Sequence, residues 1–400
     1  MIIKNRHSIV YLSNAVSESI LVRREITTDS PAATNKVLSL VKAIHMQNLN
    51  CFVLSLGRGR QNNSLKRHAA SLEKYNQVAT LYCDFWQMPV LTHIVTMVSM
   101  TILLNYLINR RKGITVLAYN RSYHYLPALI LAKLKGVRIC LDLEDGFNGD
   151  GKSNFSYLKN TLTRKIFDWL CSGGVMVSCS GLVSQIEYQT AYVCYGISNK
   201  QEIQQKKWKS TKLQFLLSGS LLEEVGCLLL LETLSLLIKN NPELSKKIHF
   251  NVTGKGSCES EFRSFAAIAP DWLTFHGSLT RKEYLDILRE SHIGMSLRLR
   301  RFEMGSTTFP SKVIEYAEYG LVVLTTRSSD VPILFGEAAA YLSEETPAGL
   351  AYLITSLIKS REHLIGLAKS GYGKINEVCS PLKVGTEMKK MLLAKKSIED

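Results

Sequence analysis

The stretch from Phe309 to Thr326 constrains the fold most, because it places a helix, a tight turn and a buried strand in immediate succession. Pro310 suits the first turn of a helix, where no backbone N–H is needed, and apolar residues follow it at helical spacing. Gly320 is a typical helix stop. The run Leu321–Leu324 is short, apolar and rich in β-branched residues, as in strands buried on both faces of a parallel sheet. The stretch therefore predicts one unit of an α/β fold.

The alternation of strands and helices continues along the chain in two series. It predicts an α/β protein with two Rossmann-like, doubly wound parallel-sheet domains that face each other across a cleft. We expect a first domain over 1–198, a polar, basic linker over 199–212, a second domain over 213–378 and a C-terminal helix over 379–400. Apolar runs expected to form strands lie at 8–12, 51–56, 114–119, 137–143, 174–180, 191–195, 213–217, 248–254, 273–277 and 293–299.

The loop before the organising helix is the first candidate binding site. It combines a basic run with four small residues, Gly305 to Thr308, and leads into a helix that starts near Ser311. Free N–H groups and the positive dipole end at such a helix start favour a phosphate. Glu315, on the same helix, can only accept hydrogen bonds, so it is better suited to sugar or ribose hydroxyls. The alternative is that Ser311 simply starts a helix on which Glu315 is a solvated residue.

The pattern PSKxxEYxxxG, from Pro310 to Gly320 and followed by a hydrophobic strand, resembles the donor-binding element of retaining glycosyltransferases of family 4. These enzymes have the GT-B architecture, and the likeness is greatest to the branch that builds bacterial surface polysaccharides. The resemblance assigns Glu315 to the nucleotide ribose. The family has a second glutamate before it, in a pair separated by seven residues, and that position is Thr307 here. Contact to the transferred sugar would then fall to the Thr307 hydroxyl.

The same resemblance assigns the second domain to the nucleotide-sugar donor and the first to the acceptor, with the C-terminal helix crossing back to the first domain. Gly219 and Ser220 belong to the first strand-turn-helix of the donor half, where small residues let the chain turn tightly. Gly254 lies in a GxG turn like that of the family. The loop after Gly277 is where the family holds the base, mostly through backbone groups.

A cation for the diphosphate is also expected in the donor half. Many family members place a basic residue before the glycine that starts the first helix of this half, and Val225 stands there instead. The remaining candidates are Lys312, Arg298, Arg300 and Arg301, since Arg suits bidentate phosphate contact and Lys acts as a point charge. Each of them could equally belong to an ordinary exposed basic loop.

In the first domain, the strand over 137–143 ends in Glu144 and Asp145. Carboxylates at the carboxyl end of a parallel strand lie where open α/β sheets bind ligands. The resemblance implies a catalytic or positioning His or Asp after this strand, and Glu144 and Asp145 are the nearest match. The alternative for Asp145 is a turn with the following glycine.

Two helices give further signals. Thr280 and Glu283 form the Ser/Thr-x-x-Glu pattern of a capping box, which predicts a helix through Glu290. Met88–Asn109 is the most apolar helix, and three basic residues, 110–112, follow it. Its length approaches that of a membrane span, but Pro, His, Asn, Ser and Thr lower its hydrophobicity. A buried core helix is the favoured interpretation, an interfacial helix the second and a true span the third.

The net charge of +15 and the pI near 9.3 call for an anionic partner, which could be nucleic acid, a nucleotide sugar or the anionic cytoplasmic leaflet. No nucleic-acid-binding motif accompanies the charge, so nucleic acid is not expected. The nine cysteines are scattered without a CxxC pair, which is typical of reduced, buried residues in the cytosol. The N-terminus has no secretory signal pattern.

These features predict a glycosyltransferase that moves a sugar from a nucleotide-diphosphate sugar to a lipid-linked saccharide at the inner face of the cell membrane, in surface polysaccharide or lipopolysaccharide synthesis. The resemblance implies retention at the anomeric carbon. No Asp-x-Asp motif stands at a suitable strand end, so neither a metal nor another cofactor is expected, and helix-end N–H groups and basic side chains would stabilise the leaving diphosphate. The alternatives are a sugar-nucleotide epimerase or hydrolase of the same architecture and a non-catalytic nucleotide-sugar-binding scaffold subunit.

Overall fold

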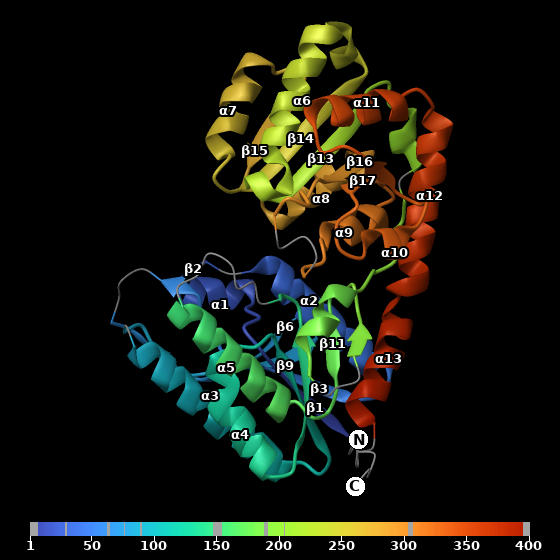
Figure 1. The fold of residues 1–400 in the computed structure, drawn as a ribbon. Coiled ribbons are helices and arrows are strands. Elements are labelled where there is room, and N and C mark those ends of the chain that lie inside the picture. Colours follow the sequence, from blue (N-terminus) through green and yellow to red (C-terminus); the bar gives the residue numbers. More distant parts are fainter. Residues whose placement is uncertain are drawn as a thin grey trace. The chain divides into compact units, whose positions relative to one another are not determined.

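A computed structural model describes residues 7–28, 30–61, 65–75, 77–88, 90–146, 154–187, 191–203, 205–302 and 307–394. The chain divides into two compact units (Figure 1). The first contains residues 1–197 and 381–400, and the second contains residues 198–380. The segment expected as a linker, 199–212, is part of the second unit, where Lys207 and Trp208 are buried.

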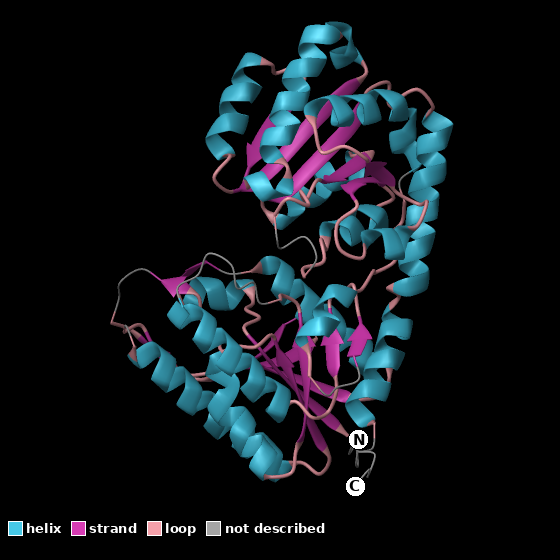
Figure 2. Ribbon diagram, in the orientation of Figure 1, coloured by secondary structure: helices cyan, strands magenta, loops and turns pink. Residues whose placement is uncertain are grey.

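The first unit is built on an eight-stranded sheet in the order β12-β11-β10-β9-β1-β3-β7-β6, parallel except for the β6–β7 pair. Its central strands are apolar and buried because helices cover both faces of the sheet (Figure 2). The sheet strands are β1 (Ser8–Ser13), β3 (Asn50–Ser55), β6 (Ser71–Tyr75), β7 (Val78–Tyr82), β9 (Ile114–Tyr119), β10 (Arg138–Leu143), β11 (Val175–Val177) and β12 (Ala191–Val193). Two short pairs lie outside it: β2 (Ile26–Thr28) with β4 (Arg60–Gln61), and β5 (Arg67–His68) with β8 (Phe85–Trp86).

The helices of the first unit include one from the far end of the chain. Helix α13 packs on α2, and a Cβ at Gly385 of α13 would lie 2.5 Å from the Ala43 carbonyl oxygen, so this close approach requires glycine. The helices are α1 (Glu18–Arg23), α2 (Pro31–Met46), α3 (Leu91–Arg110), η1 (Tyr123–Tyr125), α4 (Leu126–Leu134), α5 (Asn154–Leu170), η2 (Ser180–Gln185) and α13 (Pro381–Leu393).

Helix α3 corrects one sequence-based interpretation. It is long and apolar enough to cross a membrane by length and composition, but only 17% of its most apolar window is buried. The favoured interpretation as a buried core helix is therefore wrong. The physical reason is its position in the fold, because α3 packs on α4 on one side while other apolar side chains remain exposed.

The second unit has a six-stranded parallel sheet in the order β15-β14-β13-β16-β17-β18. Its hydrophobic core joins β13, β14, β16 and β17 to α6 and α11. The strands are β13 (Leu213–Ser220), β14 (Ile248–Lys255), β15 (Leu273–Gly277), β16 (Ile293–Ser296), β17 (Val322–Thr326) and β18 (Ala340–Leu342). The helices are η3 (Gln205–Lys209), η4 (Glu223–Val225), α6 (Cys227–Asn240), η5 (Pro242–Lys246), α7 (Glu259–Ile268), α8 (Arg281–Glu290), α9 (Lys312–Glu318), α10 (Val331–Phe335), α11 (Pro347–Leu357) and α12 (Arg361–Val378).

Both sheets confirm the predicted fold class of Rossmann-like, doubly wound parallel sheets. Strand order reverses beside the first strand of each series, between β1 and β9 and between β13 and β16. Ligands of open α/β sheets bind outside the carboxyl ends of strands at such a switch point. We therefore expect the functional side chains of each unit near its switch point.

Candidate active site

The carboxyl ends of β13 and β14 carry a pair of facing glycines. Gly219 pairs in register with Gly254, and both have positive φ, 118° and 142°. A Cβ at Gly254 would lie 1.8 Å from the Gly219 carbonyl oxygen, so only glycine fits. A Cβ at Gly219 would lie 3.8 Å from Cε of Lys312, which places the stem of Lys312 beside this edge. The predicted glycines therefore let backbone and the Lys312 side chain approach one another.

The carboxylate of Glu315, on α9, accepts hydrogen bonds from its own helix and from α8. Its Oε2 accepts from the Tyr284 hydroxyl at 2.7 Å and from Lys312 Nζ at 2.6 Å. Its Oε1 lies 3.5 Å from Nη1 of Arg281. The Glu315 side chain remains 20% exposed, so the carboxylate is still accessible to a ligand. The structure thus gathers the predicted pair Lys312 and Glu315 with two residues of α8.

The pKa of Glu315 reflects these contacts. Burial alone would raise it, but the Lys312 ammonium, the Tyr284 hydroxyl and the Arg281 guanidinium outweigh burial and lower the pKa below its ordinary value. Burial and the neighbouring Glu315 carboxylate raise the pKa of Tyr284 well above its ordinary value. At neutral pH the site therefore holds an ionised carboxylate and a neutral phenol that donates to it.

A second layer of hydroxyls supports this carboxylate. Ser218 Oγ, at the end of β13, lies 3.2 Å from the Tyr284 hydroxyl and 2.9 Å from the Tyr316 hydroxyl. The Tyr316 ring packs against Gly294 of β16, where a Cβ would lie 2.2 Å from Cγ of the ring. Since β13 and β16 flank the switch point, these contacts fix α9 directly above it.

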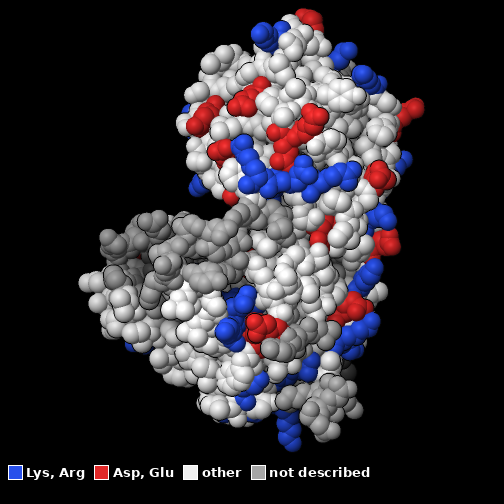
Figure 3. All heavy atoms as spheres, in the orientation of Figure 1, with Lys and Arg blue, Asp and Glu red and all other residues white. Residues whose placement is uncertain are grey.

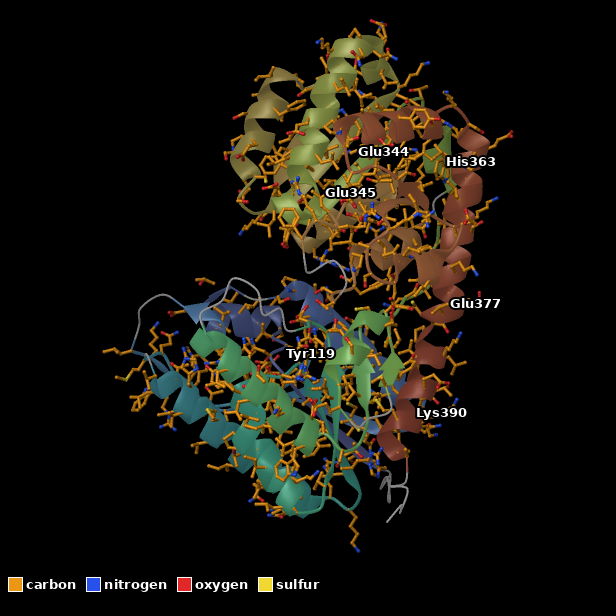
Figure 4. All side chains as sticks on the ribbon, viewed as in Figure 1. Tyr119, Glu344, Glu345, His363, Glu377 and Lys390 are labelled. Carbon is orange, nitrogen blue, oxygen red and sulfur yellow. The ribbon has the colours of Figure 1, made fainter. Side chains whose placement is uncertain are left out.

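Two of the predicted phosphate cations in the basic loop pair with carboxylates. Arg300 Nε pairs with Glu345 Oε1 at 2.9 Å, and Figure 4 labels this glutamate. Arg301 Nη2 pairs with Glu223 Oε1 at 2.5 Å. The side chains of Arg300 and Arg301 are 56% and 63% exposed, and Figure 3 shows a band of basic side chains beside acidic ones on this unit. A phosphate would have to compete with these carboxylates. The carbonyl oxygen of Arg298 accepts a hydrogen bond from the Thr326 hydroxyl.

The remaining residues predicted for the donor half are Ser311, Ser220, Gly277 and Thr307. Ser311 is exposed, and its side chain makes no capping hydrogen bond to α9. Ser220 is exposed at the end of β13, and Gly277 has a φ of 63° and accepts at its carbonyl from Thr253 Oγ1 at 2.8 Å. Thr307 is half-buried. Residues Gly305 and Ser306, predicted as part of the phosphate loop, lie outside the described residues.

Sequence reasoning missed Arg281, Tyr284 and Ser218. The available signal was the capping box, which is confirmed: Thr280 caps α8 and Glu283 bonds back to it. That box fixes Arg281 at the first position of α8, and Tyr284 lies three residues on, on the same helix face. The sequence therefore contained enough information to predict Arg281 and Tyr284 as site residues. They lie on one face of the first turn of the helix that follows the loop predicted to hold the donor.

The predicted carboxylates of the first unit lie at the end of β10, and they have partners. Glu144 pairs with Lys36 of α2, whose Nζ also lies 3.3 Å from Asp142 Oδ1. Asp145 accepts at Oδ2 from Asn120 Nδ2 at 3.2 Å, and its side chain is exposed. The buried Asp142 accepts from the Tyr11 hydroxyl. Lys36 therefore balances the charge of Glu144, whereas Asp145 is held by a neutral amide.

Two observations concern metals and thiols. All nine cysteines are buried and lie outside any disulfide, as expected for reduced thiols. Within the described ranges, no group of three or more His, Cys, Asp or Glu side chains is arranged to hold a metal ion.

Comparisons with known proteins agree with this architecture. A family model described as glycosyl transferases group 1 matches residues 212–360. The UDP-forming α,α-trehalose-phosphate synthase from Burkholderia xenovorans, solved in complex with glucose-6-phosphate, is 12% identical, with a TM-score of 0.66 over 97% of this chain and 100% of that one. The catalytic domain of starch synthase IV from Arabidopsis thaliana, bound to ADP and acarbose, is 10% identical, with a TM-score of 0.67 over 97% and 99%.

A comparison with proteins of curated function gives no match. At these identities the structural likeness shows the fold alone, which is GT-B. The match of the second unit to a glycosyltransferase model adds the enzyme class. Together they support a transferase of the nucleotide-sugar-dependent glycosyltransferase type with two Rossmann-like units.

Proposed function

We propose that this glycosyltransferase moves a sugar from a nucleoside diphosphate sugar to a hydroxyl of a lipid-linked saccharide, with retention at the anomeric carbon, in the synthesis of a bacterial surface polysaccharide. The observation that carries the donor half of the proposal is the ionised Glu315 carboxylate beside the glycine edge of β13 and β14. It supports a site for a ligand with hydroxyl donors close to an anionic group.

In this proposal Glu315 accepts hydrogen bonds from the ribose hydroxyls. Lys312 and Arg281, which both contact Glu315, would also stabilise the negative charge of the diphosphate as it leaves. The exposed Arg300 and Arg301 are further candidates, because exposed ion pairs contribute only about 0–1 kcal/mol and open readily. The protein would need no metal and no other cofactor, since side-chain cations supply the electrostatic stabilisation.

Three residues are proposed for the chemistry at the sugar and the acceptor. Thr307 would contact the transferred sugar through its single hydroxyl. Glu144 or Asp145 would position the acceptor hydroxyl from the first unit. The pairing of Glu144 with Lys36 favours Asp145 as the more available acceptor of a proton or hydrogen bond, because its carboxylate is exposed and has no cation among the described residues.

Helix α3 supports an acceptor in a membrane. Its exposed apolar side chains recur every four residues and so form one stripe: Ile94, Val98, Ile102 and Tyr106, each 51–61% exposed. Arg110, at its end, stacks over the Tyr106 ring at 4.9 Å, and two more basic residues follow. Figure 3 shows few charged side chains over α3 and α4 on the face it presents. An apolar stripe with a basic end suits the anionic inner leaflet, which gives a cytoplasmic, peripheral location.

The reaction is tested by incubating the full-length protein with a panel of labelled nucleotide sugars, with and without membrane lipid extract. We expect label in the lipid fraction, dependent on the extract. Turnover of the nucleotide sugar without an acceptor would instead indicate an epimerase or hydrolase. Binding without any turnover would indicate a scaffold subunit, which Thr307 and Val225 would favour because family members carry charged groups there.

The membrane contact has a separate test with a matched control. Val98→Asp places a charge in the α3 stripe, and Ile268→Asp places one at an 85% exposed apolar position on α7 of the second unit. In flotation with vesicles containing phosphatidylglycerol, we expect Val98→Asp to lose vesicle binding and Ile268→Asp to keep it. Equal flotation of both variants and the parent protein would remove the α3 surface from the proposal.

A further inference from the structure

A cluster of basic side chains lies at the switch point of the first sheet, apart from Glu144 and its partners. Arg58 follows the end of β3, and His93 lies in the first turn of α3. Tyr123 and His124 form η1, just after β9, which ends at Tyr119, a residue labelled in Figure 4. Because β3 and β9 lie on either side of β1 in the sheet, the segments after β3 and β9 and the start of α3 bring these side chains together at its carboxyl edge.

The nitrogen atoms of the cluster converge closely. Arg58 Nη1 lies 3.1 Å from His93 Nδ1, and Arg58 Nη2 contacts both ring nitrogens of His124, Nδ1 at 3.2 Å. His93 Nδ1 is 2.8 Å from His124 Nε2 and 3.0 Å from the Tyr123 hydroxyl. The two imidazole rings are stacked, with centroids 5.1 Å apart and an interplanar angle of 18°.

This arrangement has more donors than acceptors, although Ser122 Oγ also lies 3.0 Å from His124 Nδ1. A guanidinium only donates, and each imidazole nitrogen offers either one proton or one lone pair. His93 Nδ1 therefore cannot satisfy Arg58, Tyr123 and His124 at once. Within the described ranges, no carboxylate pairs with Arg58, although burial already lowers the pKa of its guanidinium. A partly buried cation without an anionic partner is unfavourable unless a ligand supplies the charge.

The position of Arg58 is fixed by its own backbone. Asn14, directly after β1, donates from Nδ2 to the Arg58 carbonyl oxygen at 2.8 Å and accepts at Oδ1 from the Arg58 N–H at 3.3 Å. His124 is only 6% exposed, whereas Arg58, His93 and Tyr123 are half-buried. The cluster is therefore preorganised and still partly exposed, which suits a binding site better than a fully solvated surface.

We propose that Arg58, His93, Tyr123 and His124 bind a phosphoryl group of the acceptor substrate. Two guanidinium N–H groups, two imidazoles and one phenol converge, which exceeds what the two oxygens of a carboxylate can accept and matches the three or four oxygens of a phosphoryl group. That the phosphoryl group belongs to an acceptor substrate rests on the proposed function. Binding of an anion rests on the cluster alone. The phosphoryl group could belong to a lipid-linked diphosphate or to a soluble sugar phosphate.

The anion site is tested without any transfer reaction. Side-chain nitrogen NMR of the full-length protein follows the nine histidines while inorganic pyrophosphate is added. We expect the His93 and His124 resonances, assigned with His93→Asn and His124→Asn, to shift with saturation. Arg58→Gln should weaken this binding about tenfold or more, because charge-assisted hydrogen bonds contribute about 1.5–3 kcal/mol. Arg67→Gln, at a 66% exposed ion pair of the same unit, is the matched control.

Two outcomes overturn the proposal: unshifted His93 and His124 resonances, or binding that Arg58→Gln and Arg67→Gln alter equally. Lys312→Ala removes a donor-half cation and should leave the two histidine shifts unchanged.

In transfer assays, Arg58→Gln should raise the KM for the acceptor about tenfold and leave the donor KM within twofold. Competition by a soluble sugar phosphate or by a lipid diphosphate in vesicles tells which source the site takes. Histidine shifts without any transfer would refute the proposed function and leave the anion site standing.

Discussion

The carboxyl edges of the two sheets both lie at a switch point, and each carries a polar cluster of opposite character. At the edge of the second sheet, a carboxylate, Glu315, collects donors from Lys312, Tyr284 and Arg281. At the edge of the first, a guanidinium, Arg58, contacts two imidazoles and no carboxylate of the described chain. The Glu315 cluster thus offers acceptor oxygens to hydroxyls, and the Arg58 cluster offers donors to an anion. The two sheets therefore share one architecture, and the few side chains at their carboxyl edges give them different binding properties.

The glycines of the two edges give the largest expected difference. Gly254→Ala would place Cβ 1.8 Å from a backbone oxygen, whereas Gly57→Ala, after β3, would meet the end of the Arg24 side chain at 2.6 Å. The strand backbone can move aside less easily than the end of a side chain. We therefore expect Gly254→Ala to lower the free energy of unfolding of the second unit by about 4 kcal/mol or more, and Gly57→Ala to lower that of the first unit by less. Urea unfolding measures both. Gly366→Ala, with open space around its Cβ, is the control, and equal costs at the two edges would contradict this difference.

The second prediction compares two carboxylates of α9. Glu318 lies on the same helix as Glu315, is 9% exposed and accepts a hydrogen bond from Nε2 of Gln201 at 3.2 Å. Burial raises the pKa of Glu318 to about 7, so its contribution to stability is full below pH 4.5 and is lost as the pH rises through about 7. Glu318→Gln should therefore stabilise the protein by about 3 kcal/mol at pH 8.

Urea unfolding at several pH values checks this prediction. The difference between Glu318→Gln and the parent protein should shrink to near zero at pH 4.5. Glu243→Gln, at a 74% exposed position of the same unit, should show no comparable pH-dependent difference. A gain in stability that is the same at every pH would mean that ionisation of Glu318 is not its cause.

The third prediction tests the chemistry of the second edge. Glu315→Ala removes the carboxylate that accepts hydrogen bonds from Tyr284 and Lys312 and pairs with Arg281. We expect the affinity for the nucleotide-sugar donor to fall about tenfold to a hundredfold. Equilibrium binding of the donor measures the change. Glu243→Ala is the matched control for a lost glutamate in an exposed pair. Unchanged donor affinity in Glu315→Ala would remove this residue from the donor site.

The smallest effect is expected at the basic loop. Arg301→Gln breaks an exposed ion pair with Glu223, so stability should change by less than about 1 kcal/mol. If Arg301 also contacts the diphosphate, the donor affinity should fall about threefold to tenfold. Lys246→Gln removes an exposed lysine that pairs with Glu243 and serves as the control. A donor affinity equal to that of the control would show that Arg301 does not contribute to donor binding.

Local signals determined much of this protein. The capping box at Thr280 and Glu283 specified α8 through Glu290, and the helix, turn and strand around Gly320 formed where the pattern predicted, since caps, periodicity and glycine conformations act within a few residues. The Lys312–Glu315 pair is equally local, at three residues' separation on one helix. The fold class followed from the repetition of such units.

Tertiary structure decided the contacts that join distant segments. Tyr284 reaches Glu315 across 31 residues of chain, and Arg300 reaches Glu345 across 45, so neither partner could be chosen from sequence spacing. The same apolar periodicity fits a buried and an exposed helix, and only the position of α3 at the side of its unit left the Ile94–Tyr106 stripe uncovered. Arg58 and His124 meet because β3 and β9 flank β1, and that strand order is a property of the folded sheet.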